Sequence, residues 1–241
     1  MSKAKLPPNI LSRKITTVAI DRDLLSIAKT YNICETSKRW KYDRDVQFSE
    51  CTAFAISEDL VLTAGHCIDA SNFRNFYFML GFDRDPMSSI TIDSSNIFEP
   101  VEFIDGIKES SRGMDFALIR VHKKIPQNKI YSCSSVKSLQ SQERFYMVGH
   151  PLGTYAKISI DGILLENTNK YYFQLAIDAF GGNSGSPVLS EFEHKVKGIL
   201  ISGHTDLVEG KSCSEFVFCD SKTHCSGEKS LGFPVYLIAR R

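Results

Sequence analysis

The 241-residue sequence contains no long hydrophobic run, no strong excess of either charge, no internal repeat and no low-complexity segment. No apolar stretch approaches the roughly 20 residues that a membrane-spanning helix needs, so we expect no membrane span. The formal net charge is +1, which gives no electrostatic reason to expect nucleic acid or an anionic membrane as a partner. Of the whole sequence, 42% of the residues are hydrophobic and 24% are charged, an ordinary composition for a globular protein with a substantial core.

Residues 1–9 are polar and lack the long apolar region of a signal peptide. The seven cysteines nevertheless fit an oxidising compartment better than a reducing one. We therefore expect a secreted or periplasmic protein whose signal peptide has been removed. The odd number leaves at least one cysteine unpaired or bound to another molecule.

Cys213, Cys219, His224 and Cys225 are close enough in sequence to raise the question of a metal site. Their Cys-x5-Cys-x5-Cys spacing lacks the close Cys-x2-4-Cys pairs of structural zinc sites, so we expect no metal. A disulfide within this loop is the better interpretation, with the pairing left open.

The most informative segment is Gly181–Pro187, which reads Gly-Gly-Asn-Ser-Gly-Ser-Pro. Small residues around Ser184 would let a reacting carbonyl group approach the backbone closely. Such a segment alone is a weak signal, because glycine and serine are common in ordinary turns.

Two further motifs add weight to this signal. His66 follows the apolar run 60–63, which predicts a buried strand that leads into a tight turn, and Asp115 opens a second run at 115–121. Serine, histidine and aspartate are the three parts of an acyl-transfer triad. Their order along the chain, His, Asp, Ser, is that of chymotrypsin-like enzymes and not of subtilisin-like enzymes or α/β-hydrolases.

These motifs resemble the chymotrypsin-like serine proteases, and within them the bacterial branch that includes the glutamyl endopeptidases. The resemblance covers about residues 50–237. It includes Val148–Gly153, which is similar to the turn that borders the oxyanion loop in bacterial members, and Cys51 and Cys67, which in the family form a disulfide that closes the histidine loop. It implies an all-β protein of two six-stranded antiparallel β-barrels with the active site in the cleft between them.

Many short apolar runs separated by turns also favour an all-β sandwich or barrel. We expect an N-terminal extension at 1–49, either a propeptide or a support for a barrel, a first barrel at 50–125 with the histidine and aspartate, and a connection with a second barrel at 126–241 with the serine. By analogy with zymogens of the family, a bridge between Cys34 and Cys133 would tie the extension to the connection.

The resemblance assigns a role to each triad residue. A serine hydroxyl is a poor nucleophile until a base takes its proton, so His66 is expected to be the general base and later the general acid. Asp115 would hold the imidazole tautomer. The backbone N–H groups of Gly182 and Ser184 are the candidates for the oxyanion hole, although a plain turn is the alternative interpretation of the glycines. We expect no cofactor.

Asn183 departs from the pattern of the digestive members, which have an aspartate just before the nucleophile. That aspartate pairs with a newly cleaved N-terminus, and an amide cannot form this ion pair. The chain also has no Ile-Val-Gly-Gly start. We therefore expect no activation switch of the trypsinogen type.

Asp178 lies six residues before Ser184, the offset at which trypsin-like enzymes place the acid of the specificity pocket. If Asp178 lies there, the enzyme prefers Arg or Lys before the cleaved bond. The alternative is that it caps or braces the loop.

Ile201, Ser202 and Gly203 are expected to form the pocket wall and to pair with an extended substrate. Glutamyl endopeptidases have His-Trp-Gly there, whereas His204 in this chain is one place further along, so the sequence argues against a preference for glutamate. The remaining histidines are predicted to be exposed loop residues: His122, His150, His194 and His224.

The sequence thus predicts a monomeric serine endopeptidase that acts on proteins or peptides. A catalytically silent pseudoprotease that binds protein is the alternative from another class. An esterase with the same site would share the acyl chemistry.

Overall fold

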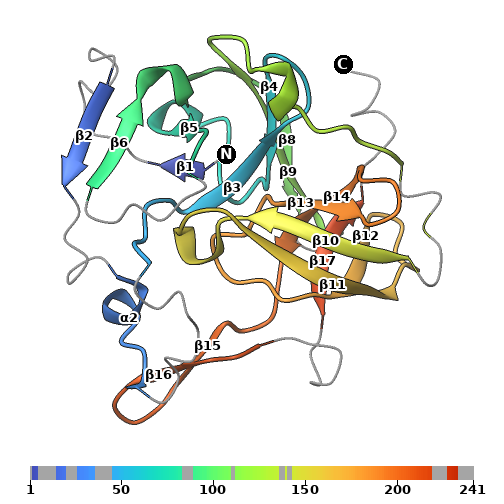
Figure 1. Cartoon of the computed structure of the whole chain (residues 1–241). Coiled ribbons are helices and arrows are strands. Elements are labelled where there is room, and N and C mark those ends of the chain that lie inside the picture. The colour runs from blue at the N-terminus through green and yellow to red at the C-terminus, as the bar shows by residue number, and fades with distance from the viewer. Residues whose placement is uncertain are drawn as a thin grey trace.

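β-Strands make up most of the ordered elements of this protein (Figure 1). The computed structural model describes residues 2–4, 15–19, 26–35, 45–82, 89–109, 112–135, 139, 143–218 and 227–232. Within these residues the one α-helix is α2 (Ile27–Thr30), and four single turns of 3-10 helix occur at Phe73–Asn75, Ser94–Asn96, Gln127–Lys129 and Pro151–Gly153. The all-β prediction is therefore confirmed.

The first half of the chain contributes a seven-stranded antiparallel sheet in the order β7-β5-β1-β3-β4-β9-β8. Every residue of β3 and β4 is buried, as expected for continuous apolar runs inside a core. The seven strands are β1 (Ser2–Ala4), β3 (Cys51–Ala55), β4 (Leu60–Thr63), β5 (Tyr77–Met79), β7 (Ile97–Phe98), β8 (Pro100–Glu109) and β9 (Met114–Val121).

The second half forms a closed barrel of six antiparallel strands in the order β10-β11-β12-β17-β14-β13. Closure leaves no strand edge unpaired. The strands are β10 (Arg144–Gly149), β11 (Lys157–Glu166), β12 (Tyr172–Ala176), β13 (Pro187–Ser190), β14 (Val196–Ser202) and β17 (Glu228–Gly232). One of the two predicted six-stranded barrels is thus confirmed, whereas closure of the first half into a barrel stays a prediction.

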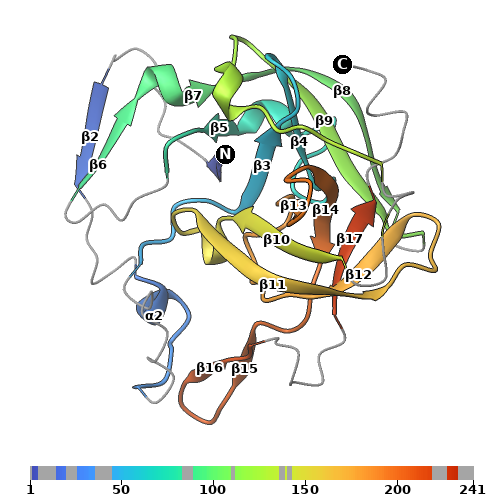
Figure 2. The ribbon, with the colours of Figure 1, turned by 45° about the vertical axis from the view of Figure 1, so that its right-hand side comes forward.

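One hydrophobic cluster joins the two halves. Leu62 and Leu118 of the first sheet pack in the same cluster as Leu189 and Ile199 of the barrel, and all four are buried. The sheet and the barrel therefore lie against each other, and residues at the ends of their strands can meet (Figure 2).

Two small sheets complete the described structure: β2 (Ile15–Ala19) pairs with β6 (Ser89–Asp93), and β15 (Leu207–Glu209) pairs with β16 (Ser214–Phe216). Helix α2 lies near the β15–β16 hairpin in both views (Figures 1 and 2). A disulfide between Cys34 and Cys213 joins the segment after α2 to this hairpin.

This disulfide corrects the prediction that Cys34 bridges Cys133. The hairpin folds back beside α2, and backbone hydrogen bonds run from Cys34 N–H to Ser214 O and from Ser214 N–H to Asn32 O, so Cys213 is the cysteine within reach. It also removes Cys213 from the expected loop disulfide, whose other members, Cys219 and Cys225, lie outside the described residues.

Candidate active site

The end of β4 and the start of β9 bring His66 and Asp115 together. The two strands are antiparallel, with Thr63 opposite Ala117, so the turn after β4 lies beside the first residues of β9. Asp115 Oδ1 accepts the backbone N–H of His66 at 2.7 Å, and Asp115 Oδ2 lies 2.6 Å from His66 Nδ1. A carboxylate in this position holds the proton on Nδ1, which leaves Nε2 as the basic nitrogen of the ring.

A disulfide closes the histidine loop as expected from the family. Cys51 and Cys67 are bonded, with their Cα atoms 6.3 Å apart. Their sulfur atoms lie near the ring of His66, and the three side chains are close enough to suggest a metal site. Both sulfurs are used in the disulfide, so these residues do not form one.

The backbone of Ser184 is held against the same loop. The N–H of Thr52 donates to Ser184 O at 2.9 Å, and Cys67 Sγ lies 3.8 Å from that oxygen. Because Thr52 and Cys67 belong to the disulfide-closed loop, Ser184 lies beside the turn that carries His66. Residues that are far apart in sequence thus meet where the sheet contacts the barrel.

The turn before Ser184 is tight and depends on glycine. Gly182 has φ +86°, and its carbonyl accepts the Thr52 hydroxyl at 2.9 Å. A Cβ at Gly182 would lie 2.5 Å from both His150 O and Gly153 N. The segment Val148–Gly153 therefore borders this turn so closely that no side chain fits at the glycine.

Two N–H groups of this turn remain available. Asn183 donates its N–H to Phe180 O at 3.0 Å. Within the part of the chain that the structure describes, the N–H groups of Gly182 and Ser184 donate to no protein acceptor. A developing oxyanion requires two such unused donors, one from the serine itself and one from the turn before it.

A pocket of about 90 Å³ opens beside Ser184. Of the predicted wall residues, Ser202 and Gly203 line it, whereas Ile201 is buried in the core cluster that joins the halves. Asp178 is half-buried after β12 and is not among the lining residues.

Three ionisable lining residues were not predicted from the sequence: His204, Asp206 and Glu228. Asp206 Oδ2 accepts the N–H of Gly181 at 2.5 Å, and burial raises the pKa of Asp206. No sequence signal marks Glu228, because only the pairing of β17 with β14 brings it to the pocket.

His150 corrects the prediction of an exposed loop residue. It is 4% exposed, its Nδ1 lies 2.9 Å from Thr154 O, and its ring stacks on Phe82. Burial lowers its pKa to about 3, so the ring is neutral. His122 and His194 are exposed as predicted, whereas His224 lies outside the described residues.

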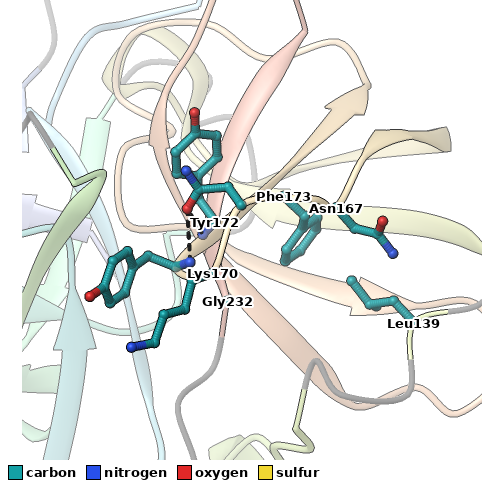
Figure 3. Close-up of a pocket in the computed structure, with 8 residues that line it drawn as sticks. Leu139, Asn167, Lys170, Tyr172, Phe173 and Gly232 are labelled. Atoms are coloured by element: carbon teal, nitrogen blue, oxygen red, sulfur yellow. Dashed lines mark hydrogen bonds between the residues drawn. The ribbon is translucent and has the colours of Figure 1, made fainter.

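A smaller pocket of about 60 Å³ lies near the start of β12 (Figure 3). Lys170, Tyr172 and Gly232 are among its lining residues, and Asn169 Oδ1 accepts the backbone N–H groups of Tyr171 and Tyr172. None of the predicted triad residues lines it, so it is separate from the candidate active site.

Comparison with known families agrees with this geometry. The model of the trypsin-like peptidase domain matches residues 51–199. The chain belongs to the trypsin-like peptidase family. This trypsin-like peptidase is therefore a hydrolase that acts on protein substrates, whereas the predicted kinship with glutamyl endopeptidases stays a prediction.

The trypsin-like peptidase is also similar to solved structures of Rv3671c from M. tuberculosis H37Rv. One is the protease in its inactive form and the other is an inactive serine-to-alanine mutant. Each is 15% identical over 76% of this chain, with a TM-score of 0.44, and the match covers 77% of the former chain and 75% of the latter. No curated protein matches the sequence. Among the described residues, no helix is long and apolar enough to cross a membrane.

Proposed function

We propose that this trypsin-like peptidase is a serine endopeptidase that cleaves peptide bonds through an acyl-enzyme on Ser184. The observation that best supports the proposal is the two-point contact of Asp115 with the backbone and the ring of His66, beside the serine turn. Such contact fixes both the position and the tautomer of an imidazole base.

The reaction follows from this arrangement. His66 Nε2 takes the proton of Ser184 Oγ as the oxygen attacks the carbonyl carbon of the substrate. The imidazolium then gives the proton to the leaving amine, and Asp115 stabilises the positive charge. A water molecule, activated by the same nitrogen, releases the acyl group and restores Ser184.

The N–H groups of Gly182 and Ser184 are proposed to stabilise the tetrahedral intermediate. Their freedom from protein acceptors supports this role, because a donor that is already aimed costs no reorganisation when the negative charge develops. The loss of one such donor typically slows the reaction by about a hundredfold or more.

A preference for Arg or Lys before the cleaved bond is part of the proposal. Among the described residues, the pocket beside Ser184 is lined by the acids Asp206 and Glu228 and by no lysine or arginine. Ionised carboxylates in this wall favour a cationic side chain and disfavour glutamate. Secretion or a periplasmic location is proposed as well, because disulfides persist in oxidising compartments, and we propose a monomer.

Covalent labelling with a fluorophosphonate probe tests the proposed nucleophile. We expect the wild type to be labelled and Ser184→Ala to remain unlabelled. Ser186→Ala is the matched control, because the Ser186 hydroxyl lies two residues away in the same turn and is buried with no hydrogen-bond partner among the described residues. This variant should be labelled like the wild type.

Hydrolysis of an unfolded protein substrate and of a simple ester distinguishes the alternatives. An endopeptidase cleaves both, whereas a pure esterase cleaves only the ester. A wild type that is neither labelled nor active would contradict the proposal and favour a pseudoprotease that binds protein.

A further inference from the structure

Glu228 is the first residue of β17, and it lines the same pocket as Ser184. The residue is 1% exposed. Its Oε1 accepts the backbone N–H of His204 at 3.1 Å, whereas its Oε2 is buried and has no hydrogen-bond partner among the described residues. Buried polar atoms are nearly always paired, so an unpaired carboxyl oxygen in a pocket is a candidate for contact with a ligand.

The neighbouring strand makes room for this carboxyl group. β17 pairs with the end of β14, where Lys229 lies opposite Ser202, so Glu228 comes beside Gly203. A Cβ at Gly203 would overlap Oε2 of Glu228. The glycine predicted to contact substrate thus also leaves the space that the carboxyl group occupies.

The surroundings of Glu228 are acidic. Burial raises its pKa to about 8, opposed by the His204 hydrogen bond and reinforced by the charges of Asp206 and Asp178. Asp178 follows β12, whereas His204 and Asp206 follow β14, so acids approach the pocket from two elements. On β17 itself, the ammonium of Lys229 lies over the ring of Tyr172, away from the carboxyl group.

We propose that Glu228 determines the specificity of this pocket by binding, through Oε2, the ammonium group of a lysine side chain that precedes the cleaved bond. The inference rests on the proposed endopeptidase function and deepens it. It assigns the recognition to Glu228 in place of Asp178, the acid that sequence offset suggested.

The geometry favours lysine over arginine. Oε1 is engaged by the N–H of His204, so Oε2 is the oxygen without a hydrogen-bond partner among the described residues. A guanidinium group binds carboxylates best as a fork that uses both oxygens, whereas an ammonium group donates its hydrogen bonds singly.

Recognition by Glu228 is coupled to proton release. With a pKa of about 8, the carboxyl group of the empty pocket is mostly protonated at neutral pH. Binding of an ammonium group favours the ionised carboxylate, so the proton leaves to solvent. Since kcat/KM reports ionisation in the free enzyme, kcat/KM for a lysine substrate should rise with pH until about pH 8 and then level off.

The test uses the full chain and peptides that differ only in the residue before the cleaved bond: lysine, arginine or glutamine. The kcat/KM values are compared from about pH 6 to about pH 9, which spans the ionisation, with active-site concentration titrated by the fluorophosphonate probe. Dividing the kcat/KM for lysine by that for glutamine removes every pH dependence that the two substrates share. We expect this ratio to rise about tenfold per pH unit below the pKa of Glu228.

Two isosteric variants distinguish the acids. Glu228→Gln keeps an acceptor for the His204 N–H and should lose about a hundredfold in kcat/KM for lysine, with labelling retained and the pH-dependent rise abolished. Asp178→Asn should keep the lysine preference, and the midpoint of the rise should move to lower pH because a neighbouring negative charge is gone.

Three results would overturn the inference while leaving the proposed function intact: an unchanged lysine preference in Glu228→Gln, loss of that preference in Asp178→Asn, or faster cleavage after arginine than after lysine in the wild type. If Glu228→Gln does not fold, a flat ratio of lysine to glutamine in the wild type overturns it equally. Absence of probe labelling and of hydrolysis in the wild type would instead reject the endopeptidase function, and the inference with it.

Discussion

Gly185, directly after Ser184, shows how closely the sheet and the barrel approach each other at the scale of single residues. Its φ is +88°, a conformation that other residues adopt with strain. A Cβ there would overlap Thr52 O and Thr63 Oγ1, which belong to β3 and β4. Ser184 can therefore lie beside the histidine loop only if the next residue, at position 185, has no side chain.

Gly185→Ala should accordingly lower the free energy of unfolding by about 3 kcal/mol, from backbone strain together with steric overlap. Gly81→Ala is the matched control, because Gly81 has a similar φ of +81° but only Asn96 Nδ2 near a Cβ, at 3.6 Å. It should lose about 1 kcal/mol from strain alone. Urea denaturation measures both, and equal losses would show that crowding at the serine turn contributes nothing.

The same residues show what a sequence can predict. Ser184 lies within a short motif that gains weight from the His66 and Asp115 motifs of the same chain, so it could be predicted without a fold. Glu228 has no such motif, because it meets the pocket only through the register of β17 on β14. His150 was misjudged because its burial comes from contacts with Phe82 and Thr154 that no local pattern encodes.

At the scale of elements, the segment around α2 supports the loop that carries the serine turn. Ile27 packs in one cluster with Leu152 and Phe180, and Phe180 directly precedes Gly181 of that loop. The rings of Phe216 and Phe218 lie edge-on to Phe180, at centroid distances of 5.8 Å and 5.7 Å. The Cys34–Cys213 disulfide links the segment after α2 to the β15–β16 hairpin. We therefore propose that this part of the N-terminal extension is a support and not a propeptide.

Replacement of both cysteines, Cys34→Ser with Cys213→Ser, should lower the free energy of unfolding by about 4 kcal/mol, because the bridge closes a long loop in the unfolded chain. Turnover should fall as well, since the cluster beneath Gly181 loosens. Ser212→Ala, at the exposed neighbour of Cys213, is the control and should match the wild type. Unfolding in urea without reductant, together with kcat, measures the effect; an unchanged stability would show that the bridge does not anchor the segment.

Strands and disulfide pairing differed in how well the sequence predicted them. Strands β4 and β9 were predicted from their apolar runs, which the structure buries throughout β4 and from Phe116 to Ile119 in β9. The partner of Cys34 could not be predicted, because the choice of Cys213 depends on a hairpin that folds back across a sequence separation of 179 residues.

At the scale of the whole molecule, two buried groups with opposite pKa shifts shape the pH dependence of stability. Burial raises the pKa of Glu228 from 4.5 to about 8 and lowers that of His150 from 6.5 to about 3. The folded state therefore keeps a proton on Glu228 that the unfolded chain loses above pH 4.5. Conversely, His150 stays neutral in the folded state below pH 6.5, where the unfolded chain protonates it. The first effect reduces stability as pH rises and the second increases it.

The two effects overlap and cancel between pH 4.5 and pH 6.5, where we expect a plateau of stability. From pH 6.5 to about pH 8, Glu228 is the one of these two groups that still acts, and its contribution to the free energy of unfolding should fall by about 2 kcal/mol, at 1.36 kcal/mol per pKa unit. Glu228→Gln should abolish this fall. Urea denaturation at pH 6.5 and at about pH 8 tests this prediction. A wild type that is equally stable at both pH values would contradict the raised pKa of Glu228.

The place of β1 in the first sheet has a consequence for how molecules meet. Ser2 and Lys3 pair with β3 on one side, and Ser2–Ala4 pair with β5 on the other. If this segment is displaced, two neighbouring strands each expose a row of unpaired backbone groups, which is a template for another chain. Residues 2–4 of a second molecule have the right sequence to pair with the exposed β3 and β5. The strand that joins β3 to β5 within one molecule is therefore also the strand that two molecules can exchange.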